Sequence, residues 1–210
     1  MKRPTAILIS GRGSNMSALI DAARDPAFPA EVALVLSNNP DAAGLGVAHA
    51  SGIAARAVDH RPYGRNRAAH EAAIDAALRE AGIEIVCLAG YMRLLTPFLV
   101  DAWQGRMLNI HPSLLPSFPG LHTHARALAA GVRLHGCTVH LVTHEMDAGP
   151  ILAQAAVPVL PGDTEDTLAA RVLRQEHAIY PAALAAVAAG RPAALPAADA
   201  RLANPLPWVG

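Results

Sequence analysis

The feature that most constrains the fold of this 210-residue chain is the alternation of short β-rich runs with longer helical stretches. Such alternation is typical of parallel strands joined by crossover helices, and it predicts an open α/β fold in three α/β/α layers. The predicted strands lie near 5–10, 31–37, 54–58, 83–89, 106–111, 134–143 and 150–159, and the predicted helices are 15–24, 42–51, 65–81, 97–103, 122–130 and 164–189.

The run at 83–90 is almost continuously apolar, as expected of a strand that is covered on both faces. It indicates the centre of a mainly parallel, doubly wound, Rossmann-like sheet of about seven strands. The length favours a single domain, which we expect over residues 1–190, with its last helix starting at Thr164 and ending before Gly190. Residues 191–210 carry four prolines among alanines, and we expect them to form a surface tail.

The charge balance argues against large anionic partners. The chain has 17 basic and 17 acidic residues, so no electrostatic field favours nucleic acid or a membrane surface, and small-molecule substrates are expected instead. Its two cysteines, Cys87 and Cys137, lie in apolar runs typical of buried free thiols. The N-terminus has no secretory signal pattern and no apolar run approaches a membrane span, so we expect a cytoplasmic protein.

A glycine-rich loop, Ser-Gly-Arg-Gly-Ser-Asn at 10–15, follows the first predicted strand and precedes a predicted helix. Backbone N–H groups at such a helix start favour an anion. The loop lacks the full Gly-x-Gly-x-x-Gly fingerprint, since position 16 is Met, and it lacks the ending of a P-loop. Two interpretations stay open on the loop alone: a phosphate site, or a turn in which Ser14 or Asn15 caps the helix.

Asn109 and His111 stand two residues apart in a predicted strand that breaks at Pro112. Side chains two apart share a face, so an amide donor and a titratable imidazole converge at the strand end. Acyl transfer needs a proton shuttle and a donor aimed at the oxygen that becomes negative, and these residue types supply both. The alternative is that both side chains merely satisfy backbone groups at the strand break; the proline-rich loop 112–120 weighs against it.

Asp147 lies in a polar turn at 144–150 between two β-like runs. A carboxylate near an imidazole favours the protonated ring, so Asp147 is a candidate partner for a catalytic histidine. The alternative is an ordinary Asp-x-Gly turn. Histidines are frequent between 111 and 144, but no set has the spacing of a known ligand motif, so we expect no metal.

Taken together, these segments resemble the folate-dependent formyltransferases, and most closely the phosphoribosylglycinamide formyltransferase family. The similarity covers most of residues 5–190 and rests on the segments 9–15, 88–95, 109–116, 119–124, 147–150 and 175–181. The Asn-x-His and Ser-Leu-Leu-Pro elements are shared by the wider group of formyltransferases and formyl-folate hydrolases. The Gly-Ser-Asn loop and the Gln-Glu-His segment select this family.

The resemblance implies an enzyme of de novo purine (IMP) biosynthesis that moves the formyl group of 10-formyltetrahydrofolate, its co-substrate, to the amino group of glycinamide ribonucleotide without a metal. It makes Asn109 the oxyanion donor, His111 the general acid, and Asp147 the group that holds water and keeps His111 charged. It also implies two binding sets: Gly13, Ser14, Asn15 and Glu176 for glycinamide ribonucleotide, and Arg67, Met92, Arg93, Leu94, Leu95, Asn109, Thr143, His144, Glu145, Met146 and Asp147 for formyl-folate.

Three alternatives are weighed against this resemblance. A 10-formyltetrahydrofolate hydrolase would use the same three residues on water, but it usually has a regulatory domain before the glycine-rich strand, which here is expected from residue 5. A methionyl-tRNA formyltransferase would carry a further nucleic-acid-binding domain after the catalytic one. A nicotinamide-dependent reductase or a nucleotide-binding module without formyl chemistry could use the same sheet, but the incomplete glycine fingerprint disfavours both.

Overall fold

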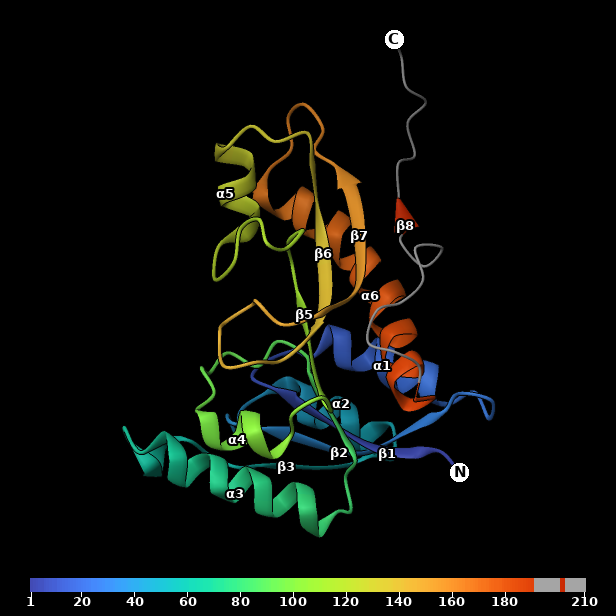
Figure 1. Cartoon of the computed structure of the whole chain (residues 1–210), viewed down its shortest axis with the longest axis vertical. Helices are drawn as coiled ribbons and strands as arrows, with labels where there is room; N and C mark the ends of the chain where they lie inside the picture. The colour runs from blue at the N-terminus through green and yellow to red at the C-terminus, as the bar shows by residue number, and fades with distance from the viewer. Residues whose placement is uncertain (191–200, 203–210) are drawn as a thin grey trace.

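Figure 1 shows the computed structural model, which describes residues 1–190 and 201–202. In these residues the chain forms one sheet in the order β3-β2-β1-β4-β5-β6-β7-β8. The strands are β1 (Arg3–Ile9), β2 (Ala30–Ser37), β3 (Ala54–Ala57), β4 (Ile85–Leu88), β5 (Met107–His111), β6 (Leu134–Leu141), β7 (Ile151–Pro158) and β8 (Arg201–Leu202). The helices are α1 (Ser14–Ala23), α2 (Ala43–Ala50), η1 (Arg61–Tyr63), α3 (Arg67–Glu80), α4 (Pro97–Ala102), α5 (Thr123–Ala129) and α6 (Glu165–Ala188).

The predicted α/β fold is confirmed, with each of the seven predicted strands and six predicted helices present. Strands β1 to β5 are parallel, whereas β6 runs antiparallel to both β5 and β7. The short helix η1 and the two-residue strand β8, which pairs with β7, were not predicted. The rest of the expected tail, 191–200 and 203–210, lies outside the described residues.

Two apolar cores lie on opposite faces of the sheet. Strand β4 is buried at every residue between β1 and β5, which confirms its predicted central place. One core packs α1 and α6 against the sheet, and the other packs α3 and α4 against it (Figure 1). This arrangement fits a parallel sheet, whose strands are apolar on both sides.

Helix α6 begins as its sequence predicts. Thr164 is its N-cap and forms a capping box with Thr167, and the helix ends just before Gly190, which has a positive φ of 68°. Both cysteines are free and buried. Within the described part of the chain, no helix is both long and apolar enough to cross a bilayer.

Candidate active site

The candidate site is built where β5 meets the antiparallel strand β6. Asn109 lies opposite His140 and His111 lies opposite Thr138 in this pairing. His111 is buried at the last position of β5, next to the loop that begins at Pro112. The central strands β1 and β4 also deliver their following loops to this edge, because carboxyl ends of parallel strands share one edge of a sheet.

The structure brings His111 and Asp147 together. The Nδ1 atom of His111 lies 3.5 Å from Oδ2 of Asp147, and its Nε2 atom lies 3.0 Å from the carbonyl oxygen of Phe118. Both ring nitrogens therefore face acceptors, and only the doubly protonated imidazolium has an N–H for each. The structure thus places these two predicted residues side by side, and their catalytic roles stay a prediction.

Asp147 is held in place by its own turn and by the proline-rich loop. Its φ of 55° lies in the left-handed region, where aspartate is one of the better tolerated residues. Its Oδ2 atom accepts a 2.8 Å hydrogen bond from the backbone N–H of Gly120. The loop itself is tied down by Thr123, whose hydroxyl donates to the carbonyl of Pro112 at 2.7 Å. The Asp147 carboxylate and the loop 112–120 thus hold each other in place beside His111.

His140 is a member of the site that sequence reasoning did not assign. Its Nδ1 atom lies 3.0 Å from the Leu141 carbonyl oxygen, which places the proton there, so the Nε2 lone pair accepts the 3.2 Å hydrogen bond from the Asn109 amide. Burial lowers the pKa of His140, which agrees with a neutral ring. The only sequence signal was its position in a strand neighbouring β5, and the pairing register is not visible in the sequence.

The Asn109 amide is oriented by this contact. One hydrogen of its Nδ2 atom points to His140, and an amide nitrogen carries a second hydrogen that can donate elsewhere. Asn109 is only half-buried, so that second hydrogen can meet a ligand. The arrangement provides an amide donor and an imidazole at one strand end, the two kinds of group that acyl transfer requires.

The glycine-rich loop leads into α1 without a side-chain cap. Gly13 is the N-cap, with φ 72° and ψ 39°, so neither Ser14 nor Asn15 caps the helix, and that alternative is wrong. Asn15 instead donates a 2.6 Å hydrogen bond to Oε2 of Glu176 on α6, while its own Oδ1 atom is buried and has no partner among the described residues. Burial raises the pKa of Glu176, and the Asn15 hydrogen bond partly opposes that rise.

The residues expected to bind formyl-folate fall on helix α3, strand β5 and two segments, 92–95 and 143–147. Met92, Leu94 and Met146 are exposed, although large apolar side chains are usually buried. Arg67, at the start of α3, donates to the Leu94 carbonyl at 3.3 Å. The segment that follows β4 starts beside Asn109, because Leu88 pairs with that residue. These features provide an apolar, accessible surface next to Asn109, the proposed oxyanion donor.

His144 departs from this pattern, since its Nε2 atom lies 2.6 Å from Oδ1 of Asp101 on α4 and both side chains are exposed. The neighbouring Thr143 hydroxyl donates to the Glu145 carbonyl at 3.1 Å. Two of the five residues of the expected turn, Thr143 and His144, therefore already have hydrogen-bonding partners within the protein. Among residues 1–190 and 201–202, no group of three or more His, Cys, Asp or Glu side chains is placed to hold a metal.

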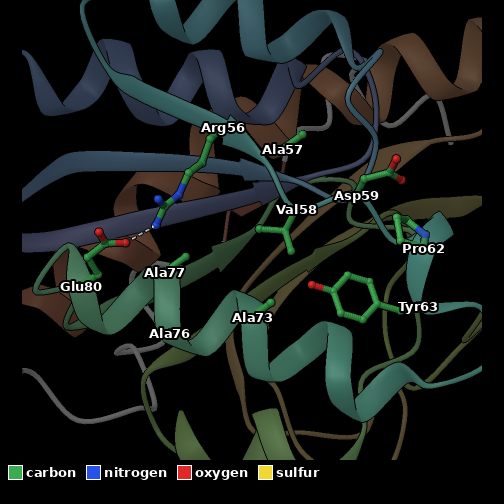
Figure 2. A pocket seen from close by; sticks show the side chains of 10 residues that line it. All are labelled: Arg56, Ala57, Val58, Asp59, Pro62, Tyr63, Ala73, Ala76, Ala77 and Glu80. Carbon is green, nitrogen blue, oxygen red and sulfur yellow. Dashed lines mark hydrogen bonds and ion pairs between the residues drawn. The ribbon is translucent and has the colours of Figure 1, made fainter.

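A separate groove lies between β3 and α3, with a volume of about 580 Å³. Figure 2 shows the Arg56–Glu80 ion pair, 2.7 Å long, at one end and the Tyr63 ring near the other. None of the candidate site residues lines it. It is a surface feature apart from the chemistry described above.

Comparisons with known proteins agree with this geometry. The formyl transferase family model matches residues 3–184. The Escherichia coli phosphoribosylglycinamide formyltransferase is 48% identical over 88% of this chain and 87% of its own. The crystal structure of phosphoribosylglycinamide formyltransferase from Brucella melitensis superposes with a TM-score of 0.86 at 57% identity, covering 91% of this chain and 98% of that one.

The Homo sapiens trifunctional purine biosynthetic protein adenosine-3 is 52% identical over 90% of this chain. The chain spans only 19% of the length of that relative. The family model and the full-length bacterial relative decide the assignment, because each covers most of the chain. The chain belongs to the phosphoribosylglycinamide formyltransferase family.

Proposed function

We propose that this protein transfers the formyl group of 10-formyltetrahydrofolate to the amino group of glycinamide ribonucleotide, giving formylglycinamide ribonucleotide in de novo purine (IMP) biosynthesis. The observation that carries the proposal is the convergence of the Asn109 amide, the His111 ring and the Asp147 carboxylate at the end of β5. The names of the relatives support both the acceptor and the pathway.

In the proposed reaction the uncharged amine of the substrate attacks the formyl carbon, and a tetrahedral intermediate with a negative oxygen forms. The free hydrogen of the Asn109 amide donates to that oxygen as its charge develops. The C–N bond to the folate nitrogen then breaks and leaves its electron pair on that nitrogen. His111 supplies the proton that this nitrogen takes up, and the proton of the attacking amine is lost to water.

Asp147 contributes through charge and position. Its carboxylate lies 3.5 Å from His111 Nδ1 and would orient that ring as the general acid, and the Gly120 contact fixes the carboxylate. The second carboxylate oxygen, Oδ1, has no hydrogen to receive from the neutral His140 Nε2 atom 3.7 Å away, so it remains an acceptor for water. Holding both substrates in reacting geometry supplies much of the remaining rate enhancement.

The proposed reaction also assigns the binding sites of its two substrates. The uncapped start of α1, with Gly13, Ser14 and Asn15, would hold the substrate phosphate, and buried Glu176 would accept from a ribose hydroxyl. Formyl-folate would occupy the surface formed by Arg67, the segment 92–95 and the turn 143–147. We further infer one formyltransferase domain over residues 1–190 and a cytoplasmic location, in keeping with the purine biosynthetic relatives.

A direct assay tests the proposal. Purified protein is incubated with 10-formyltetrahydrofolate, with and without glycinamide ribonucleotide, and tetrahydrofolate and formylglycinamide ribonucleotide are measured together. We expect equal amounts of the two products and no deformylation when the acceptor is left out. Deformylation at the same rate with and without acceptor would instead identify a 10-formyltetrahydrofolate hydrolase, and no reaction in either case would refute formyl chemistry.

A further inference from the structure

The segment 90–96, which connects β4 to α4, has both of its ends tied to side chains outside the predicted site. It contains four of the residues expected to bind formyl-folate, and its side chains alternate between exposed Met92 and Leu94 and half-buried Arg93 and Leu95. A loop of this length without secondary structure has no ladder to define its shape. Its geometry must therefore come from the groups to which its backbone donates.

The first anchor is Ser10, the residue that follows β1. Its backbone N–H donates to the Gly90 carbonyl at 3.2 Å, and its Oγ atom accepts a 2.8 Å hydrogen bond from the N–H of Met92. The same hydroxyl donates its proton to Oδ1 of buried Asn38 at 2.5 Å. Because that proton is committed to Asn38, the oxygen lone pairs are aimed at Met92.

The second anchor is Glu71, a buried residue of α3. Its Oε1 atom accepts a 2.8 Å hydrogen bond from the Thr96 N–H, and its Oε2 atom accepts from the Thr96 hydroxyl. Both carboxylate oxygens are thus used by one residue of the segment. A buried carboxylate is costly unless it is hydrogen-bonded, so the carboxylate and the segment end depend on each other.

Thr96 also marks where the segment ends, since it is the N-cap of α4. A threonine at this position often accepts a hydrogen bond from the first turn of its helix. In the described part of the chain Thr96 makes no such side-chain cap, and its hydroxyl donates to Glu71 on α3. The long-range contact to α3 therefore fixes the end of the segment.

We propose that Ser10 and Glu71 are positioning residues that clamp the segment 90–96 at its two ends and so pre-form the surface that binds formyl-folate. This inference rests on the proposed function, since it assigns the clamp to the folate side of that reaction. A pre-formed surface binds more tightly because the ligand does not have to order the loop. Loss of a clamp therefore weakens folate binding, whereas the Asn15–Glu176 contact, which includes neither Ser10 nor Glu71, should stay intact.

Steady-state kinetics in both substrates test the Glu71 clamp. We expect Glu71→Ala to raise the KM for 10-formyltetrahydrofolate about tenfold or more, with the KM for glycinamide ribonucleotide changed by less than about twofold. Glu71→Gln keeps an acceptor for the Thr96 N–H and a group that can bond the hydroxyl, so it should restore the folate KM to within about threefold of the parent.

Asp75 provides a matched control on the same helix. It is also a buried carboxylate, and it accepts from Trp103 Nε1 at 2.9 Å and Arg79 Nε at 2.7 Å, away from the segment. Asp75→Ala should lower the free energy of unfolding but leave the folate KM unchanged. An equal rise in folate KM in Asp75→Ala, or an unchanged folate KM in a folded Glu71→Ala, overturns the proposal.

Two further measurements test the clamp even if Glu71→Ala does not fold. They also distinguish a failure of the clamp from a failure of the proposed function. Thr96→Val removes only the hydroxyl donor, and an unchanged folate KM in that variant also overturns the clamp. Amide hydrogen exchange of the peptide covering 90–96 needs no substrate: we expect faster exchange in Thr96→Val and in Ser10→Ala than in Asp75→Ala. If exchange is faster in these variants but the parent protein transfers no formyl group, the proposed function is refuted and the clamp is kept. If the parent transfers the formyl group but exchange in the variants is unchanged, the clamp is refuted and the proposed function is kept.

Discussion

At the scale of single residues, two histidines on adjoining strands differ in what their ring nitrogens face. His111 faces the Asp147 carboxylate with Nδ1 and the Phe118 carbonyl with Nε2. His140 faces a carbonyl with Nδ1 and the Asn109 amide with Nε2, so it needs one proton only. The His111 ring serves as the proposed acid, and the neutral His140 ring orients the proposed oxyanion donor.

Asn109→Ala tests the oxyanion role. We expect kcat to fall by roughly 10²–10³, the usual cost of losing one such donor, with smaller changes in the KM of either substrate. Rapid-quench or steady-state turnover at saturating substrates measures the effect. A kcat within about threefold of the parent, in a folded protein, would leave Asn109 as a structural partner of His140.

Asp147→Asn tests the electrostatic role. The amide keeps an acceptor for Gly120 but removes the charge beside His111. If that charge supports His111 as the acid, kcat at saturating substrates should fall by about tenfold or more in Asp147→Asn, with smaller changes in the KM of either substrate. A kcat within about threefold of the parent, in a folded protein, would leave Asp147 as a turn residue.

At the scale of elements, the β6–β7 connection controls where Asp147 lies. Gly149 passes so close to the Leu141 carbonyl oxygen that an added Cβ would lie 1.7 Å from it, so a side chain there must displace the turn. By contrast, Gly46 in α2 has no atom within 4 Å of such a Cβ. Two glycines of one chain therefore have opposite expected responses to alanine.

Gly149→Ala should reduce kcat by about tenfold or more, because a turn displaced by even about 1 Å moves the carboxylate away from His111. Gly46→Ala should leave kcat unchanged and raise the free energy of unfolding by about 0.4–1 kcal/mol, since alanine restricts the unfolded chain and favours helix. Turnover and urea denaturation of both variants measure this. Equal kcat in the two proteins would mean that the turn position is not critical.

The elements themselves were predictable because each one carries its own periodicity. The two-residue spacing of Asn109 and His111 placed both side chains at one strand end, and Thr164 marked the start of α6. The partnership of Asp147 with His111 was expected only through family resemblance, since their separation in the chain says nothing about their separation in space. His140 and Glu71 were missed because strand register and helix-to-loop contacts are tertiary.

At the scale of the whole molecule, burial removes charge from many histidines. The pKa is lowered, with burial as the largest cause, in His70, His124, His135, His140 and His177. These residues are spread over α3, α5, β6 and α6. At these five sites the folded protein therefore binds fewer protons in mildly acidic solution than the unfolded chain does.

His135 has the largest stated shift of this set. Burial lowers its pKa from 6.5 to about 4, and its ring packs edge-on against Phe118 and His124 with ring centroids 5.8 and 5.2 Å away. Between these two pH values the unfolded chain takes up a proton on His135 that the folded protein does not. The contribution of His135 to stability is thus fully present above about pH 6.5 and is lost as the pH falls toward about 4.

His135→Leu should make the protein less sensitive to acid. Each such histidine contributes a slope of about 1.4 kcal/mol per pH unit inside its window, so the free energy of unfolding should fall less steeply between pH 6.5 and 5 in the variant. Lost ring packing lowers stability at every pH and does not affect this slope. Urea denaturation at half-unit pH steps measures it, with exposed His49→Gln as the control that keeps the parent slope. An unchanged slope in His135→Leu would show that His135 takes up its proton equally in the folded and unfolded protein.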